Sequence, residues 1–298
     1  MFDFRLKVFY TAAKQQSFSR AAEELFISQP AVSKHIRALE SYFKVKLFVR
    51  HGSKISLTPD GQVLFQYTKE IFSLYRKLQF SMDKRAKRNS GHLRLGSSTT
   101  LTQYILPRFL NQFHGEYPEI TLEVINGNSQ RIETALLNKE IELGIIEGRT
   151  QKRDFKYTPF LKDELVLVTR SDNPIAQKGA ISVEELKGVS MVLREFGSGT
   201  LQVLRHYLKK MGLSLKDLNV ELVLGNTEGI KAYLKNTRCF AVLSLNSVLE
   251  ELQRKEFTVV ELPGPSLNRF FYFINPQGDN DPLAKMFMQF VMKTLPRF

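Results

Sequence analysis

The chain has 298 residues, of which 43% are apolar and 24% are charged. This composition is typical of a folded protein, and the length favours two domains over one. A single cysteine, Cys239, excludes a disulfide scaffold and a zinc site built from several thiolates. Since no run of eighteen apolar residues and no signal-peptide pattern is present, we expect a cytoplasmic protein with no membrane partner.

Positive charge is concentrated in the N-terminal third of the chain. Residues 1–89 contain 17 Lys and Arg against 7 Asp and Glu, a net charge of +10. Residues 90–298 carry only +3 of the total of +13. This asymmetry indicates a polyanionic partner, nucleic acid before membrane, although a solvated basic face explains charge alone equally well.

Apolar periodicity in residues 1–58 predicts three short helices followed by a hairpin. The apolar positions of the three helices are Phe4, Leu6, Phe9 and Ala13, then Phe18, Ala21, Ala22 and Leu25, then Val32, Ile36, Leu39 and Phe43. Two short apolar runs on either side of residues 51–53 predict a two-stranded hairpin after the third helix.

The third predicted helix has the features of a helix that reads DNA. Ser28 is placed to cap its N-terminus, and Pro30 suits its first turn. With the apolar stripe buried, the opposite face presents short polar and basic residues, namely Gln29, Pro30, Ser33, Lys34 and Arg37. Glutamine can pair bidentately with adenine, and lysine or arginine can bind guanine or phosphate, so this face predicts a major-groove reader. The alternative is an ordinary amphipathic helix.

A longer helix is predicted from residue 59, opened by Thr58, Pro59 and Asp60. Its apolar residues recur at alternating intervals of three and four, at Leu64, Tyr67, Ile71, Leu74 and Leu78. This is the spacing of a coiled-coil seam, which predicts pairing with the same helix of a second subunit. The alternative is packing against its own domain. A basic, turn-prone linker follows at residues 83–91.

From residue 92, predicted strands alternate with predicted helices. The strands are expected at residues 93–96, 121–125, 143–146, 165–169, 191–193, 221–224, 241–244, 259–262 and 270–274. Alternation of this kind implies mainly parallel, doubly wound sheets, and the length suggests two lobes around a cleft. Proline and glycine at residues 158–160 and 263–265 make these the expected crossings between the lobes.

These patterns predict an α/β chain with an all-α winged N-terminal domain at residues 1–58. A linker and dimerisation helix is expected at 59–89, and a small-molecule-binding domain at 90–298. We place its first lobe at about 90–160 and 266–298, and its second at about 161–265.

Three segments rich in Gly, Ser and Thr each follow a predicted strand and open a predicted helix. They span residues 96–103, 196–200 and 225–229. Free N–H groups and hydroxyls at helix N-termini bind small anions, and such junctions line the cleft of an open α/β sheet. Although hydroxyl caps are common everywhere, three such segments in one two-lobed domain predict a small-molecule site between the lobes.

A set of residues between positions 17 and 61 matches the pattern of one known family. They are Ser17-Phe18-Ser19, Ala21-Ala22, Leu25, Ser28-Gln29-Pro30-Ala31-Val32-Ser33, Ile36, Leu39-Glu40, Leu47-Phe48, Arg50, Leu57-Thr58 and Gly61. In these residues the chain resembles the winged helix-turn-helix of LysR-type transcriptional regulators. The strand–helix spacing after residue 90 is similar to that family's two-lobed effector domain, which resembles a periplasmic binding protein. Lys44 departs from the pattern, because the family usually has glycine there.

The resemblance implies a sequence-specific regulator of transcription. It implies a wing that carries Arg50 and Lys54 near the DNA backbone or minor groove, and dimerisation through the helix at 60–88. It also implies tetramers that bend promoter DNA and contact RNA polymerase, and activation of a metabolic operon. A small metabolite that closes or rotates the lobes would change the tetramer's geometry on DNA.

The resemblance also implies an effector site. Residues 194–200 and 143–148 look most like regulators of sulfur assimilation and of carbon fixation, which carries effector contacts over to Ser98, Thr100, Thr102, Gln103, Ser198 and Thr200. Glu147 stands where some relatives have a hydroxyl. A carboxylate there disfavours a simple dianion unless Arg194 offsets it, and it indicates a zwitterionic effector such as an amino-acid derivative. We expect no cofactor and no metal.

Two other classes of protein fit the sequence less well. An enzyme is not predicted, because the five histidines are scattered and the chain contains no HExxH motif, nucleophile elbow or P-loop. A cytoplasmic small-molecule-binding protein without specific DNA activity is the alternative function. The basic N-terminal third opposes it, and affinity for a particular promoter would separate the two.

Overall fold

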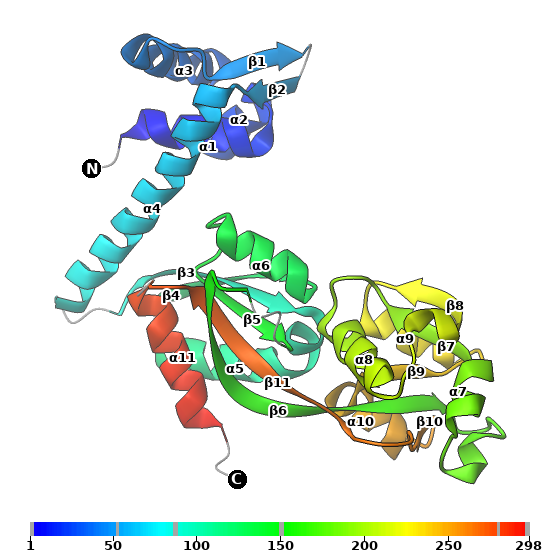
Figure 1. Cartoon of the computed structure of the whole chain (residues 1–298). Coiled ribbons are helices and arrows are strands. Elements are labelled where there is room, and N and C mark those ends of the chain that lie inside the picture. The colour runs from blue at the N-terminus through cyan, green and yellow to red at the C-terminus, as the bar shows by residue number, and fades with distance from the viewer. Residues whose placement is uncertain (1–2, 52–53, 86–88, 149–151, 279–280, 296–298) are drawn as a thin grey trace. The chain divides into compact units, whose positions relative to one another are not determined.

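The computed structural model describes residues 3–51, 54–85, 89–148, 152–278 and 281–295 (Figure 1). The chain forms two compact units, Met1–Gln79 and Phe80–Phe298, which are described separately below. Residues 52–53 of the predicted turn at 51–53 and residues 86–88 of the predicted linker lie outside the described residues. Among the helices that are described, none is both long and apolar enough to cross a membrane.

The first unit has the predicted order of three helices and a hairpin. Its elements are α1 (Phe4–Gln15), α2 (Phe18–Leu25), α3 (Gln29–Phe43), β1 (Phe48–His51), β2 (Lys54–Leu57) and the first part of α4 (Pro59–Arg85). The side chain of Ser17 caps α2 and that of Ser28 caps α3. The two strands pair antiparallel from Phe48 and Leu57 to His51 and Lys54. The predicted apolar stripes meet in one core, except for Phe4 and Phe43, which are exposed.

Two local features explain the ends of these helices. Lys44 follows α3 with a φ of +56°, in the left-handed region, which is why a glycine suits this position. Gly61 lies in the first turn of α4, where an added Cβ would come within 2.1 Å of the Leu47 carbonyl oxygen. The hydroxyl of Thr58 accepts a hydrogen bond from the Gly61 N–H at 2.9 Å, so α4 begins close against the hairpin.

The second unit alternates strands and helices. Its strands are β3 (Gly91–Ser98), β4 (Ile120–Gly127), β5 (Leu143–Glu147), β6 (Phe155–Arg170), β7 (Ser190–Arg194), β8 (Asn219–Leu224), β9 (Ala241–Ser244), β10 (Phe257–Val260) and β11 (Leu267–Pro276). Its helices are α5 (Leu106–Glu116), α6 (Ser129–Leu137), α7 (Val183–Gly188), α8 (Gly199–Lys210), α9 (Thr227–Leu234), α10 (Leu245–Gln253) and α11 (Pro282–Thr294), with short turns η1 (Leu101–Ile105), η2 (Ala176–Lys178) and η3 (Leu215–Asp217). Every predicted strand therefore corresponds to an observed one.

The prediction of mainly parallel sheets is wrong. Parallel pairing joins β3 to β4 and to β5, and β7 to β8. The long strands β6 and β11 instead pair antiparallel with each other, and β5, β9 and β10 join them antiparallel. The reason is that β6 and β11 carry the chain from one lobe to the other in opposite directions. A strand that returns the chain in this way needs no helical crossover.

The same two strands form the connection between the lobes, as Figure 1 shows. They pair from Phe155 and Pro276 in the first lobe to Leu165 and Leu267 in the second, with a register shift between Phe271 and Tyr272. Residues 158–160 lie within β6, whereas 263–265 precede β11, so the second predicted crossing is wrong. A continuous antiparallel pair of strands joins the lobes, instead of the predicted connections at proline and glycine residues.

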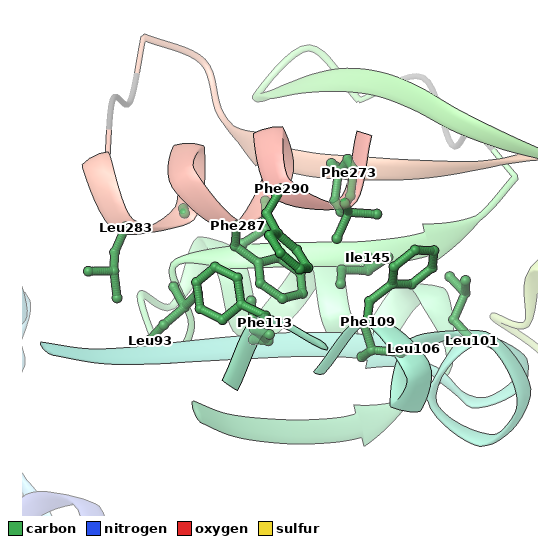
Figure 2. Close-up of a cluster of buried hydrophobic side chains, with 14 of the residues drawn as sticks. Leu93, Leu101, Leu106, Phe109, Phe113, Ile145, Phe273, Leu283, Phe287 and Phe290 are labelled. Carbon is green, nitrogen blue, oxygen red and sulfur yellow. The ribbon is translucent and has the colours of Figure 1, made fainter. Parts of the chain in front are cut away.

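The first lobe has an aromatic core that packs α5 and α11 against its strands (Figure 2). Phe113 of α5 packs against Phe287 and Phe290 of α11, with ring centroids 5.0 and 5.2 Å apart. Leu93 of β3 and Ile145 of β5 are fully buried in the same cluster. This core anchors β3 and β5, whose carboxyl ends carry residues that lie between the lobes.

Candidate functional site

The N-terminal end of α3 presents most of the predicted DNA-reading residues. The Ser28 hydroxyl accepts a hydrogen bond from the Ala31 N–H at 3.3 Å, which caps the helix. Gln29, Pro30, Lys34 and Arg37 are exposed. The face is polar and basic, as a major-groove reader requires.

Ser33 differs from the expectation. Its side chain was predicted to lie on the exposed face, but it is only 8% exposed. Its hydroxyl accepts a hydrogen bond from Gln29 Nε2 at 3.0 Å, because residues four apart on a helix are neighbours. This contact orients the Gln29 carboxamide and leaves its oxygen open to solvent.

The hairpin places two further basic residues at the surface. Arg50 and Lys54 are both exposed, on β1 and β2 respectively. The Arg50 guanidinium lies over the Phe18 ring, 5.4 Å from its centroid, which restricts the side chain's motion.

The predicted seam on α4 is apolar and exposed over most of its length. Tyr67, Ile71, Leu74 and Leu78 are exposed, with Leu74 reaching 66%. Leu64 instead packs against the core of the first unit. An exposed apolar stripe on a helix marks an interaction surface, so the seam is available to a second chain.

In the second unit, three predicted effector residues meet between the lobes. Glu147 ends β5 and is 2% exposed. Its carboxylate accepts hydrogen bonds from the Thr100 N–H at 3.4 Å and from the Thr200 hydroxyl at 3.2 Å. Thr100 belongs to the first lobe and Thr200 to α8 of the second, so one carboxylate joins both lobes.

The sequence prediction missed the cation that balances this carboxylate. Arg269 of β11 donates from Nη1 to Glu147 and, at 3.0 Å, to the Thr200 hydroxyl. Its Nε donates to Asp163 of β6 at 2.7 Å. Arg269 and Asp163 are direct cross-strand partners, and both are almost completely buried.

A signal for this pair was present in the strand pattern. Arg269 lies two residues from Leu267 and from Phe271, and Asp163 lies two residues from Leu161 and from Leu165. Since residues two apart on a strand share a face, each charged side chain lies on the apolar, inward face of its strand. A charge at an inward position is rare unless it is paired.

The other predicted effector residues lie elsewhere. Ser98 is buried at the end of β3, whereas Gln103 is exposed. Thr102 is half-buried and donates to the Ser98 carbonyl at 3.1 Å. The Ser198 hydroxyl caps α8 through the Leu201 N–H at 3.1 Å. These contacts are internal to one lobe.

Arg194 is buried but does not offset Glu147 by direct contact. Its guanidinium donates to Glu195 at 2.9 Å and to the Thr227 hydroxyl at 3.4 Å. Burial raises the pKa of Glu147, but the charges of Arg269 and Arg194 and the hydrogen bonds to the carboxylate together outweigh it and hold that pKa below its ordinary value. Glu147 is therefore ionised, with Arg269 as its partner.

A second polar contact joins the lobes through Tyr104. Its hydroxyl, on η1 of the first lobe, donates to Glu228 of α9 in the second. The Lys231 ammonium lies 3.0 Å from Glu228 and 3.0 Å from Glu251, and 3.4 Å from the Tyr104 oxygen. Burial, followed by the bond to Glu228, raises the pKa of Tyr104, so the phenol stays protonated and remains a donor.

A pocket of about 220 Å³ opens between α6 of the first lobe and α8 of the second. Of the predicted effector residues, only Ser198 lines it. At its edge the Gln130 N–H donates to the Gly197 carbonyl at 3.3 Å, and the Asn128 amide donates to the Phe196 carbonyl, also at 3.3 Å. The lobes are therefore in contact on this side as well.

Comparison with known families identifies both parts of the chain. Residues 4–62 match the model for the bacterial regulatory helix-turn-helix protein of the lysR family, and residues 86–296 match the LysR substrate binding domain. The chain belongs to the LysR family. It is a DNA-binding transcriptional regulator with an effector-binding domain.

Relatives cover nearly the whole length of this regulator. It is 31% identical to the HTH-type transcriptional regulator CysL of Bacillus subtilis, over 95% of this chain and 94% of CysL. It is also 31% identical to the HTH-type transcriptional activator CmpR of Synechocystis, over 91% of this chain and 88% of CmpR. These relatives confirm the predicted likeness to the sulfur-assimilation and carbon-fixation regulators.

Solved structures agree with the fold. Full-length CbnR complexed with its target DNA superposes with a TM-score of 0.69 at 18% identity, covering 99% of this chain and all of CbnR. The regulatory domain of Synechocystis CcmR in complex with 2-PG superposes with a TM-score of 0.62 at 28% identity, covering 68% of this chain and 96% of that domain. The winged helix-turn-helix followed by a two-lobed α/β domain is thus confirmed.

Proposed function

We propose that the regulator reads promoter DNA with Gln29, Lys34 and Arg37 of α3 and holds the backbone with Arg50 and Lys54 of the hairpin. The observation that carries this proposal is the exposed polar end of α3, where Ser33 orients the Gln29 carboxamide at 3.0 Å. An oriented amide with a free oxygen suits bidentate pairing with adenine. The exposed lysine and arginine side chains suit phosphate.

The oligomer is proposed from the α4 seam. Tyr67, Ile71, Leu74 and Leu78 would pair with the same residues of a second chain, and the resulting dimers would form a tetramer on DNA. The known full-length relative CbnR was solved on its target DNA. Contact with RNA polymerase and activation of transcription complete the proposal by analogy with the family. Since it acts on promoter DNA, we infer that the regulator works in the cytoplasm and is not an enzyme.

The sensing role is proposed for the interlobe residues. Glu147, Thr200 and Arg269 tie the two lobes together through buried polar contacts, so a metabolite that alters these contacts shifts the population of lobe arrangements. Thr100 lies in the same cluster and completes the proposed site. Binding of 2-PG by the similar CcmR domain supports a small-molecule effector.

The test is affinity for chosen DNA over a range of salt concentrations. Genomic fragments retained by the purified protein are sequenced, and the best fragment is compared with a shuffled duplex of equal length. The proposal predicts preference for the genomic fragment by about 1,000-fold or more, with affinity falling steeply as salt rises. Equal affinity for both duplexes would instead support a small-molecule-binding protein without specific DNA activity.

A further inference from the structure

The Glu147 carboxylate lies among donors of the kind that bind a free anion. One is a backbone N–H ahead of a helical turn, at Thr100, and another is a hydroxyl at the start of α8, at Thr200. The third is the guanidinium of Arg269. Backbone N–H, hydroxyl and guanidinium donors together form a typical oxyanion site. Here the anion belongs to the chain itself.

The backbone fixes where this carboxylate lies. The Glu147 carbonyl accepts a hydrogen bond from the Ser129 hydroxyl at 3.1 Å. Gly199 packs so closely that an added Cβ would come within 2.3 Å of the same carbonyl oxygen. Because only glycine permits this approach, the end of β5 and the start of α8 hold the Glu147 side chain in the site.

The charged groups in contact with Arg269 disfavour the binding of a second anion. Arg269 is shared between Glu147 and Asp163, and Asp163 also accepts from Ser244 at 2.7 Å and Asn246 at 3.0 Å. One guanidinium therefore contacts two buried carboxylates, a net charge of −1, and the more distant Arg194 is already paired with Glu195. An incoming anion at this position would meet repulsion in a region with little water to screen it.

We propose that Glu147 is a covalently attached counter-ion that fills the anion subsite between the lobes, so that the effector of this regulator binds there without a net negative charge. The inference rests on the proposed function only in placing the effector between the lobes. The Nη2 group of Arg269 is buried and has no hydrogen-bond partner among the described residues. A neutral carbonyl or hydroxyl oxygen of the effector is the acceptor that fits it.

This assignment also revises the expected role of Glu147. Its carboxylate was predicted to meet an amine of a zwitterionic effector. Because its oxygens already accept from Arg269, Thr200 and Thr100, Glu147 acts by excluding small anions from the subsite.

The test is chemical rescue. Glu147→Ala removes atoms equivalent to acetate and leaves the three donors in place. We expect the full-length variant to melt at a lower temperature than the wild type, and 100 mM sodium acetate to raise its melting temperature by about 3 °C relative to equal sodium chloride. The wild type should shift by less than about 1 °C, and butyrate, which is too long, should not rescue the variant. Equal acetate shifts in variant and wild type, or none in the variant, would overturn the proposal.

Glu133→Ala is the matched control. Glu133 is another buried carboxylate of the first lobe, but it pairs with Lys152, whose side chain is 40% exposed and can be solvated when the partner is lost. Acetate should not rescue this variant. If Glu147→Ala does not fold in chloride, its recovery on refolding in acetate decides the question, and equal recovery in the two salts overturns the proposal. None of these measurements involves DNA, so the outcome is independent of promoter binding.

Discussion

The two units of this regulator use charged and polar side chains in opposite ways. In the first unit Gln29, Lys34 and Arg37 are exposed, and the buried side chain that Gln29 contacts is a neutral one, the Ser33 hydroxyl. In the second, Glu147 and Arg269 are buried and depend on each other. Exposed charges add little to folding stability, whereas removing one member of a buried pair is costly. Substitutions should therefore separate DNA binding from stability in the first unit and couple function to stability in the second.

The largest effect is expected from Arg269→Leu. It leaves Glu147 and Asp163 as two buried carboxylates without their shared cation, which should lower the free energy of unfolding by about 3–5 kcal/mol. Urea denaturation measures this loss. Arg254→Leu is the control, because Arg254 pairs with Glu250 on an exposed helix surface and should cost less than about 0.5 kcal/mol. Equal losses would remove the contrast between buried and exposed charges.

Gln29→Ala should weaken the specific DNA site by up to about 3 kcal/mol and leave affinity for random DNA unchanged. Its melting temperature should fall only slightly, through loss of the hydrogen bond to Ser33. Lys54→Ala should weaken both DNAs alike and reduce the salt slope by about 0.9. Fluorescence anisotropy with the two duplexes measures both variants. A loss for Gln29→Ala that is the same on random DNA would contradict base reading.

Leu74→Ala tests the seam. It removes exposed apolar surface that we expect a second subunit to bury, so the dimer should weaken by about 2 kcal/mol, roughly thirtyfold in Kd. Sedimentation equilibrium gives the constant. Leu249→Ala makes the same chemical change at an exposed position of α10 and should leave the subunit association unaltered. An unchanged dimer dissociation constant for Leu74→Ala would indicate instead that the seam of α4 packs against its own domain.

The smallest effect is expected from Tyr104→Phe, which removes the hydrogen bond from η1 to Glu228 across the lobes. We expect a loss of about 1 kcal/mol, seen as faster hydrogen exchange in both η1 and α9. Tyr233→Phe is matched to it, because Tyr233 donates to Glu221 within the second lobe. Faster exchange at η1 in that control as well would argue against a specific link between the lobes.

The sequence predicted the helices and strands, because these depend on the local spacing of apolar residues. Apolar spacing gave α1 to α3 and the seam on α4, and short apolar runs gave every strand of the second unit at least in part. Pairing direction was not predictable in the same way. The antiparallel ribbon of β6 and β11 joins segments about a hundred residues apart, and its register decides that Arg269 meets Asp163. Ser33 shows the same limit on a smaller scale, because helix periodicity places it on the exposed face, whereas its side chain is buried and bonded to Gln29.

The most direct test of the account is native mass spectrometry of the intact protein, purified gently at moderate salt. It reports the subunit count and any retained ligand in one spectrum. We expect an even-numbered assembly, a dimer or a tetramer, and any small molecule bound to it should have no net negative charge at neutral pH. A monomer at micromolar concentration would contradict the role of the α4 seam and, with it, the proposed mode of DNA binding.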